Sequence, residues 1–229
     1  MRAVLVDCRF DVLDPAGGLR LYLEGHAPGA AFLDVDADLA DLSVSDAGRH
    51  PLPSAERFAE AAGWAGIANE ALVVAYGNGA ERLWWLLRHF GHEAVGVVDW
   101  RGPWRTGQEE IEPAAFTPRE REGDTIDAEE LLERLGDPRL AILDARSPER
   151  WRGEVEPIDP VAGRIPGALN AYPGLPLPDV GDREVAVYCG SGIAACTTLL
   201  DLHRAGVEGR LYPGSWSEWC RRDLPGERG

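Results

Sequence analysis

Apolar residues along this chain fall into short runs of strand length, separated by polar turns and by longer stretches with helical spacing. The clearest runs lie at 4–6, 72–76, 141–143 and 185–188. Helical spacing is clearest at 82–90 and 194–205, and each stretch ends at a glycine, Gly91 or Gly206, as helix C-termini often do. Strands that alternate with helices predict βαβ units, and therefore a parallel sheet covered by helices on both faces.

The same order of motifs occurs twice. Each half has an apolar run ending in Asp-x-Arg, a turn of the form Gly-x-x-Pro-Gly, and a central apolar run ending in tyrosine. The matched positions are Asp7 with Asp144, Gly25 with Gly163, and Tyr76 with Tyr188. The repeat predicts an α/β chain of two similar domains, each with a central, mostly parallel sheet flanked by helices. One continuous α/β domain is the alternative, and the matched order disfavours it.

The expected boundaries follow from the repeat and from local composition. We expect a first domain over 1–107, a linker over 108–124 and a second domain over 125–229. The linker prediction rests on its charged residues, on Pro113 and Pro118, and on the lack of apolar periodicity there.

The two halves differ at two informative places. The first half has roughly 26 additional residues between its Pro-Gly turn and its central run, judged from the shift in register. This insert contains Asp36 and His50. Directly after its central run the second half has Cys189, whereas the first half has Gly77. The second half therefore carries the candidate nucleophile.

Cys189 lies where a strand pattern breaks into Gly190 and Gly192 before a helical pattern begins. Two glycines let the backbone curl tightly around the sulfur, and free N–H groups at a helix start stabilise negative charge. This placement predicts a thiol that ionises readily and reacts. The alternative is a small buried hydrophobic residue, the common fate of a free cysteine.

Composition narrows the possible classes of protein. The 229 residues carry a net charge of −16, which disfavours a general nucleic-acid or anionic-membrane binder and requires local arginines to hold any anionic substrate. No apolar run approaches the roughly 18 residues of a membrane span, and no signal-peptide pattern is visible. Four cysteines without disulfide-scaffold spacing indicate cytosolic thiols, so we expect a cytoplasmic protein. Histidines and cysteines form no metal-ligand pattern, and no cofactor is expected.

The whole chain resembles the tandem-domain rhodaneses, sulfurtransferases in which an inactive first domain is joined to a catalytic second domain. The motifs that carry the resemblance are CGSGIAAC at 189–196, LYPGSWSEW at 211–219 and RLWW at 82–85. A Cys-Gly-Ser-Gly loop is similar to that of the 3-mercaptopyruvate sulfurtransferases. The resemblance therefore implies 3-mercaptopyruvate as the small anionic sulfur donor, with thiosulfate as the alternative.

The resemblance also implies roles for the loop residues. Cys189 takes the sulfane sulfur as a persulfide and passes it to cyanide, a thiol or thioredoxin. The loop that cradles the persulfide comprises Gly190, Ser191, Gly192, Ile193 and Ala194.

A proton relay is implied as well, running from Ser191 through His50 to Asp36. In that relay the carboxylate fixes the tautomer of the imidazole.

Two arginines are expected to bind the donor. Arg150, six residues after Asp144, matches the arginine that grips the substrate carboxylate. The resemblance places a second arginine nine residues later, where this chain has Asp159. Arg164 is the candidate replacement, and an interdomain salt bridge is the alternative role for it.

Two other functions compete with sulfur transfer from a small donor. Phosphatases of the same fold use a Cys-x5-Arg loop, and the sixth residue after Cys189 is Ala195, which disfavours phosphate chemistry. A sulfur-relay module would instead accept a persulfide from a partner protein. The absence of arginine at Asp159 favours that alternative, while Cys189, Arg150 and His50 favour the enzyme.

Overall fold

A computed structural model describes residues 3–229, and the chain forms two compact units. The first unit comprises residues up to Leu42 together with Leu52–Arg121, and the second comprises Ser43–Pro51 together with Glu122–Gly229. The short segment 43–51 therefore packs with the second unit, although both of its chain neighbours belong to the first.

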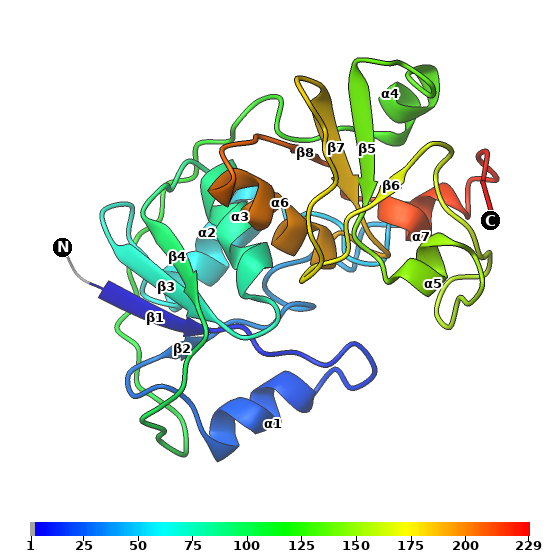
Figure 1. Cartoon of the computed structure of the whole chain (residues 1–229). Helices are drawn as coiled ribbons and strands as arrows, with labels where there is room; N and C mark the ends of the chain where they lie inside the picture. Colours follow the sequence, from blue (N-terminus) through cyan, green and yellow to red (C-terminus); the bar gives the residue numbers. More distant parts are fainter. Residues whose placement is uncertain (1–2) are drawn as a thin grey trace. The chain divides into compact units, whose positions relative to one another are not determined.

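The first unit is built on a four-stranded parallel sheet. Its strands are β1 (Ala3–Asp7), β2 (Ala31–Phe32), β3 (Leu72–Tyr76) and β4 (Val95–Val98), in the order β2-β1-β3-β4. Its helices are α1 (Gly17–Glu24), α2 (Ala55–Trp64) and α3 (Ala80–His89). Helix α1 lies on one side of the strands, and α2 and α3 lie on the other (Figure 1).

The second unit repeats this plan. Its strands are β5 (Leu140–Asp144), β6 (Leu169–Asn170), β7 (Glu184–Tyr188) and β8 (Arg210–Leu211), in the order β6-β5-β7-β8. Its helices are α4 (Ala128–Glu133), α5 (Pro148–Trp151), α6 (Ala194–Arg204) and α7 (Ser215–Trp219). Helix α6 lies to one side of the strands, opposite α5 and α7 (Figure 1).

Burial explains why the central strands are almost wholly apolar. All five residues of β5 are buried, as expected for a strand covered by helices on both faces. Strand β7 is buried from Val185 to Tyr188, and the core beside it is closed by Trp216 and Trp219 of α7. Every strand pair described in the two sheets is parallel. The expected α/β class with two helix-flanked parallel sheets is confirmed.

A polar network under each sheet confirms the repeat at atomic detail. In the second unit the hydroxyl of Tyr188 donates to Asp144 Oδ2 at 2.6 Å and accepts from the Ile165 N–H at 3.0 Å. The guanidinium of Arg146 pairs with Asp144 and donates to the Gly163 carbonyl at 2.6 Å.

The first unit makes the same contacts in the same order. The hydroxyl of Tyr76 donates to Asp7 Oδ2 at 2.9 Å and accepts from the Ala27 N–H at 2.9 Å. The guanidinium of Arg9 donates to the Gly25 carbonyl at 2.6 Å. In each unit the Asp-x-Arg and tyrosine motifs therefore tie the two middle strands of the sheet to the turn that precedes its second strand, β2 or β6.

Residues 108–121, expected as linker, pack on the first unit. The Ala114 N–H donates to the Gly63 carbonyl at 2.9 Å, and a side chain at Gly63 would lie 2.7 Å from the Ala114 carbonyl oxygen. Phe116 is buried against Phe58. An extended segment without periodicity can thus be fixed by backbone hydrogen bonds and single apolar anchors.

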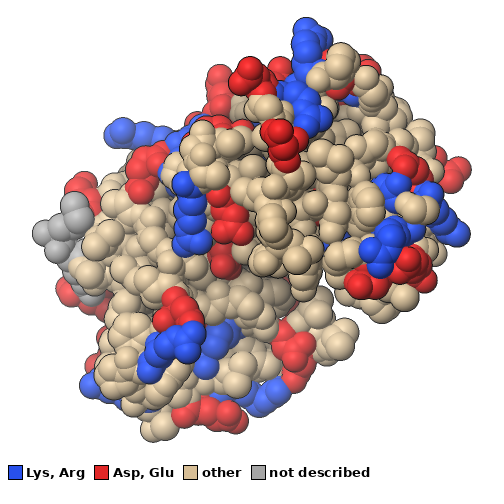
Figure 2. All heavy atoms as spheres, in the orientation of Figure 1, with Lys and Arg blue, Asp and Glu red and all other residues tan. Residues whose placement is uncertain are grey.

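Charged groups of both signs are interspersed on the face drawn in Figure 2, and every blue side chain there is an arginine because the sequence contains no lysine. Over residues 3–229, no helix combines the length and the apolar character that crossing a membrane requires.

Candidate active site

The Cys189 thiol sits in the tight loop between β7 and α6. Its Sγ accepts a hydrogen bond from the Gly192 N–H at 3.1 Å, and the side chain is 3% exposed. Gly192 has φ +84°, a conformation that a side chain would strain, so glycine is required for the loop to close on the sulfur. The Cys189 backbone N–H donates to Ser215 Oγ at 3.1 Å, which holds the loop against the start of α7.

Segment 43–51 lies directly against this loop. His50 Nδ1 and Ser191 Oγ are 2.7 Å apart, and both residues are 7% exposed. Gly48 permits the close approach, because a Cβ there would lie 2.4 Å from the Gly214 carbonyl oxygen. The structure therefore brings together Ser191 and His50, which are 141 positions apart in the sequence. The family resemblance implied that these two residues belong to one proton relay.

Arg150 also faces the loop, as expected from its place after Asp144. A Cβ built on Gly190 would lie 3.4 and 3.5 Å from the two terminal nitrogens of Arg150, so glycine at 190 leaves room for the guanidinium beside the thiol loop. The same Cβ would lie 2.8 Å from Arg49 Nη2. The guanidinium groups of Arg150 and Arg49 thus both lie next to Gly190, the residue that follows Cys189.

Buried carboxylates hold these guanidinium groups in place. Arg150 donates from Nη2 to Glu156 Oε1 at 2.6 Å and lies 3.3 Å from Asp159 Oδ2, while Arg49 Nη1 pairs with Asp159 Oδ1. Burial raises the pKa of Asp159, against the opposing effect of Arg49. Burial also acts to raise the pKa of Glu156, but hydrogen bonds from Arg150 and from the Asp159 N–H outweigh it and leave that pKa below its usual value.

Arg164 is not brought to the Cys189 loop. Its Nη1 donates to the carbonyl oxygens of Trp151 at 3.2 Å and Gly229 at 2.9 Å, and its Nη2 pairs with Glu227. The guanidinium also stacks on the Trp151 ring, 4.3 Å from its centroid. Arg164 therefore ties down the C-terminal residues of its own unit, and these contacts account for its burial.

Asp36 belongs to the first unit, in the turn that follows β2. Its backbone N–H donates to Asp34 Oδ1 at 2.9 Å, and the residue is half-buried. The assignment of Asp36 to the relay rests on the resemblance alone.

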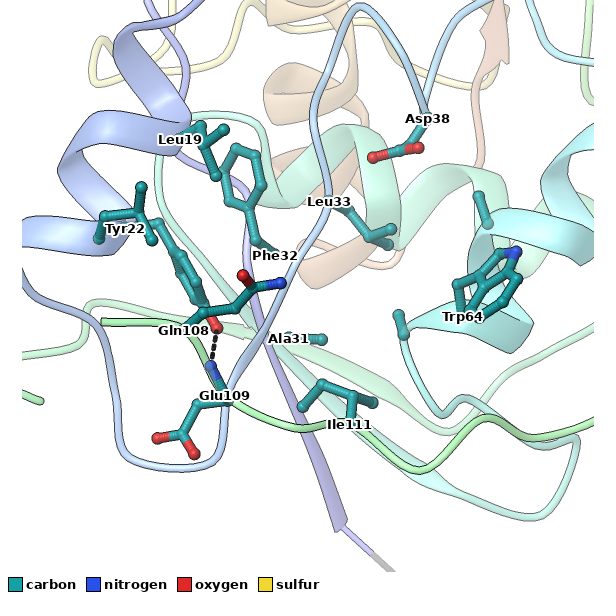
Figure 3. Close-up of a pocket in the computed structure, with 13 residues that line it drawn as sticks. Leu19, Tyr22, Ala31, Phe32, Leu33, Asp38, Trp64, Gln108, Glu109 and Ile111 are labelled. Carbon is teal, nitrogen blue, oxygen red and sulfur yellow. Dashed lines mark hydrogen bonds between the residues drawn. The ribbon is translucent and has the colours of Figure 1, made fainter. Parts of the chain in front are cut away.

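The first unit has no counterpart of the thiol. Gly77, at the place of Cys189, has φ +97°, and a Cβ there would lie 2.7 Å from the backbone nitrogen of Arg9. This unit does contain a cavity of about 500 Å³ near Phe32 and Trp64 (Figure 3). Its described lining includes no cysteine, histidine or arginine, so it holds no thiol and no cationic side chain.

The other cysteines sit in settings unlike that of Cys189. Cys8 is fully buried and Asp7 is close, and both raise the pKa of its thiol. Cys196 lies on the buried face of α6 and donates to the Gly192 carbonyl at 3.3 Å. Burial also raises the pKa of Cys220, at the end of α7. Between residues 3 and 229, no three His, Cys, Asp or Glu side chains are grouped as metal ligands would be.

The arrangement suits attack by a thiolate on an anionic sulfur compound. The Cys189 sulfur is held by a loop amide, and a serine–histidine pair lies beside it. Two guanidinium groups lie next to Gly190, the residue after Cys189. Sequence reasoning missed Arg49, although it adjoins His50. The only signal for it was that adjacency, because an arginine in an irregular loop has no periodic pattern around it.

Comparison with known proteins gives a consistent picture. A family model described as the rhodanese-like domain matches residues 127–222. A Pseudomonas aeruginosa protein, provisionally named a 3-mercaptopyruvate sulfurtransferase, is 40% identical over 94% of this chain and 88% of its own length. A Mycobacterium tuberculosis protein, provisionally named a thiosulfate sulfurtransferase, is 36% identical over 90% of this chain and 84% of its own length.

Solved structures are similar over the same range. The 3-mercaptopyruvate sulfurtransferase from Leishmania major superposes with a TM-score of 0.81 at 26% sequence identity. The match covers 96% of this chain and 71% of that protein, so both units take part in it.

Proposed function

This chain belongs to the rhodanese family and is a sulfurtransferase, and we propose that it takes sulfur from 3-mercaptopyruvate through a persulfide on Cys189. Membership of the family implies that the protein uses a sulfur donor and a sulfur acceptor, without specifying either. The identity of the donor, the covalent intermediate and the roles of individual residues form the proposal.

The first half-reaction transfers the donor's sulfur to the enzyme. The Cys189 thiolate attacks the sulfur of 3-mercaptopyruvate, an S–S bond forms, and the donor's C–S bond breaks. The electron pair of that bond passes to the donor's carbon as the enolate of pyruvate. The proton from the donor's thiol ends on this carbon, so the products are pyruvate and the Cys189 persulfide anion.

Ser191 and His50 serve this proton transfer. Their 2.7 Å separation, in a site where both are almost fully buried, supports a pair that takes the proton from the donor's thiol and returns it to the donor's carbon. The Gly192 N–H, already 3.1 Å from Sγ, stabilises negative charge on the sulfur. Arg150 binds the donor's carboxylate through a guanidinium that Glu156 orients.

In the second half-reaction an acceptor removes the outer sulfur. Cyanide, or the thiolate of a small thiol or of a thioredoxin-type protein, attacks the terminal sulfur, and the S–S bond breaks to regenerate the Cys189 thiolate. We place this chemistry in the cytoplasm, where acceptor thiols stay reduced.

The observation that carries the proposal is the hydrogen-bonded pair of Ser191 and His50 beside Cys189. In the family resemblance, serine at this place in the loop distinguishes enzymes that use 3-mercaptopyruvate from those that prefer thiosulfate. Its histidine partner gives the serine a role in proton transfer. Thiosulfate needs no such transfer, because it releases sulfite and leaves no carbon to protonate.

A donor assay tests the proposal. Purified protein is given 3-mercaptopyruvate or thiosulfate with cyanide as acceptor, and both thiocyanate and pyruvate are measured. We expect turnover with 3-mercaptopyruvate, more slowly with thiosulfate, and none in Cys189→Ser, whereas Cys196→Ser keeps activity. No turnover with either donor, together with persulfide on Cys189 after incubation with a cysteine desulfurase, would instead identify a sulfur-relay module.

A further inference from the structure

We propose that the cavity of about 500 Å³ near Phe32 and Trp64 is a binding site for a small organic cation with an apolar body. The cavity belongs to the first unit, whereas Cys189 belongs to the second. The inference therefore does not rest on the identity of the sulfur donor. It gives a ligand of its own to the unit that lacks the thiol.

The cavity lies along the open edge of the first sheet. Strand β2 is the edge strand, and among residues 3–229 it pairs with β1 alone. Helices α1 and α2 lie on opposite sides of the strands, and both line the cavity beside β2. Figure 3 shows Leu19 and Tyr22 of α1 at one side of the pocket and Trp64 of α2 at the other.

Two walls of the cavity come from parts of the chain that the repeat does not include. Helix α2 connects β2 to β3, whereas residues 171–183, which connect β6 to β7, contain no helix. The other wall is Gln108, Glu109 and Ile111, from the segment that was expected to be a linker. The resulting space has the size of known small-molecule sites, which are about 300–1,000 Å³.

Aromatic side chains give this space a character that suits a cation. The Trp64 side chain is 70% exposed, which is unusual for so large an apolar group. The rings of Tyr22 and Phe32 pack together with their centroids 5.4 Å apart. An apolar ligand would cover part of the exposed indole, and the faces of aromatic rings attract positive charge.

The charges that line the cavity are all negative. Its described lining contains no arginine or histidine, and the sequence contains no lysine. The two carboxylates of the lining are Asp38 and Glu109. Glu109 Oε1 already accepts from the Gly29 N–H at 2.9 Å and from Arg105 Nη1 at 3.0 Å. Asp38 is therefore the carboxylate that a ligand would meet.

Asp38 lacks a counter-ion. Its Oδ2 accepts from the Asp34 N–H at 2.8 Å, but within residues 3–229 its carboxylate forms no ion pair. Burial raises the pKa of Asp38 and the charge of Asp34 acts in the same direction, against the opposing Asp34 N–H and Arg57. A half-buried carboxylate without a counter-ion is costly, and a ligand ammonium group would satisfy it.

A gap in the packing, without a ligand, is the competing explanation. Such a gap would admit apolar molecules whatever their charge, because only the aromatic and aliphatic walls would act on them. A cation site built around Asp38 discriminates by charge. Probes of one shape and different charge therefore separate the two explanations.

The test uses the full-length protein and three probes that share a phenyl ring: phenethylammonium, 2-phenylethanol and 3-phenylpropionate. Binding is followed by the NMR shift of the Trp64 indole N–H, which is assigned by its loss in Trp64→Phe. The titrations are repeated with Asp38→Asn and with the control Asp99→Asn. Asp99 is an exposed carboxylate of the same unit that pairs with Arg101, so its replacement removes the same charge outside the cavity.

We expect phenethylammonium to shift the Trp64 signal saturably, with a Kd of about 1 mM or tighter. The neutral and anionic probes should bind at least about tenfold more weakly. Asp38→Asn should weaken phenethylammonium about tenfold and leave 2-phenylethanol within about twofold, and Asp99→Asn should match wild type.

Three results would overturn the inference: no saturable shift with phenethylammonium, equal affinity for all three probes, or equal losses in Asp38→Asn and Asp99→Asn. The comparison of probes uses the wild-type protein, so it decides the question even if Asp38→Asn fails to fold. The assay measures binding alone, and its failure is thus distinct from a failure of the proposed sulfur transfer.

Discussion

Replacing Ser191 by alanine removes one partner of the 2.7 Å hydrogen bond to His50 Nδ1. Both groups are 7% exposed, so water cannot readily replace the lost bond. The expected cost in the free energy of unfolding is about 1 kcal/mol, the usual contribution of a neutral buried hydrogen bond. The effect on kcat is larger, about 100-fold, because a positioned acid–base group contributes at least that much to a proton transfer.

The assay is a double-mutant cycle of Ser191→Ala, His50→Gln and their combination. We measure kcat for pyruvate release from 3-mercaptopyruvate at saturating cyanide, with urea unfolding in parallel. Because the two residues act as one unit, the double variant should be about as slow as the slower single variant. Losses that multiply, or a kcat unchanged in both single variants, would refute a shared proton-transfer role.

Three further predictions concern single residues. Ser191→Lys should shift donor preference from 3-mercaptopyruvate towards thiosulfate, and an unchanged ratio of kcat/KM for the two donors would contradict the assignment of Ser191. Gly77→Cys should restore no sulfur transfer to a Cys189→Ser protein, and should lower the free energy of unfolding by more than ~1 kcal/mol, because φ is +97° and Arg9 leaves no room for a Cβ. Glu156 has a lowered pKa in the folded protein, so its stabilisation is present above the unfolded value and is lost as pH falls through the folded one. Thermal unfolding should accordingly show a smaller loss of stability from neutral to acid pH in Glu156→Gln than in wild type, and equal losses would contradict this sign.

Much of the fold follows from periodicity. The runs ending at Tyr76 and Tyr188 became the central strands, and the stretch after Cys189 became α6 with the expected start. The edge strands β2, β6 and β8 have two residues each and therefore no period to detect. Their positions are set by pairing to the neighbouring strand, which is a tertiary property.

The candidate site could be predicted only in part, for a related reason. Cys189 and Arg150 follow strands in sequence, so their place at the ends of those strands is a local property. Arg49 reaches the loop because segment 43–51 packs with the second unit, which no local pattern encodes. In the sequence, Asp159 stands where the family resemblance places a second donor-binding arginine. In the fold, its carboxylate pairs with Arg49. Arg164 was within reach by spacing, but Glu227 and the C-terminal carbonyl of Gly229 bind it elsewhere.

The central claim is that sulfur passes through a covalent intermediate on Cys189. The most direct measurement is peptide mass spectrometry of the protein after incubation with 3-mercaptopyruvate without acceptor, followed by alkylation. We predict one additional sulfur atom on the peptide that contains Cys189, its loss on addition of cyanide, and pyruvate released in equal amount. Pyruvate release with the additional sulfur on Cys8, Cys196 or Cys220, or on no cysteine, would contradict the account.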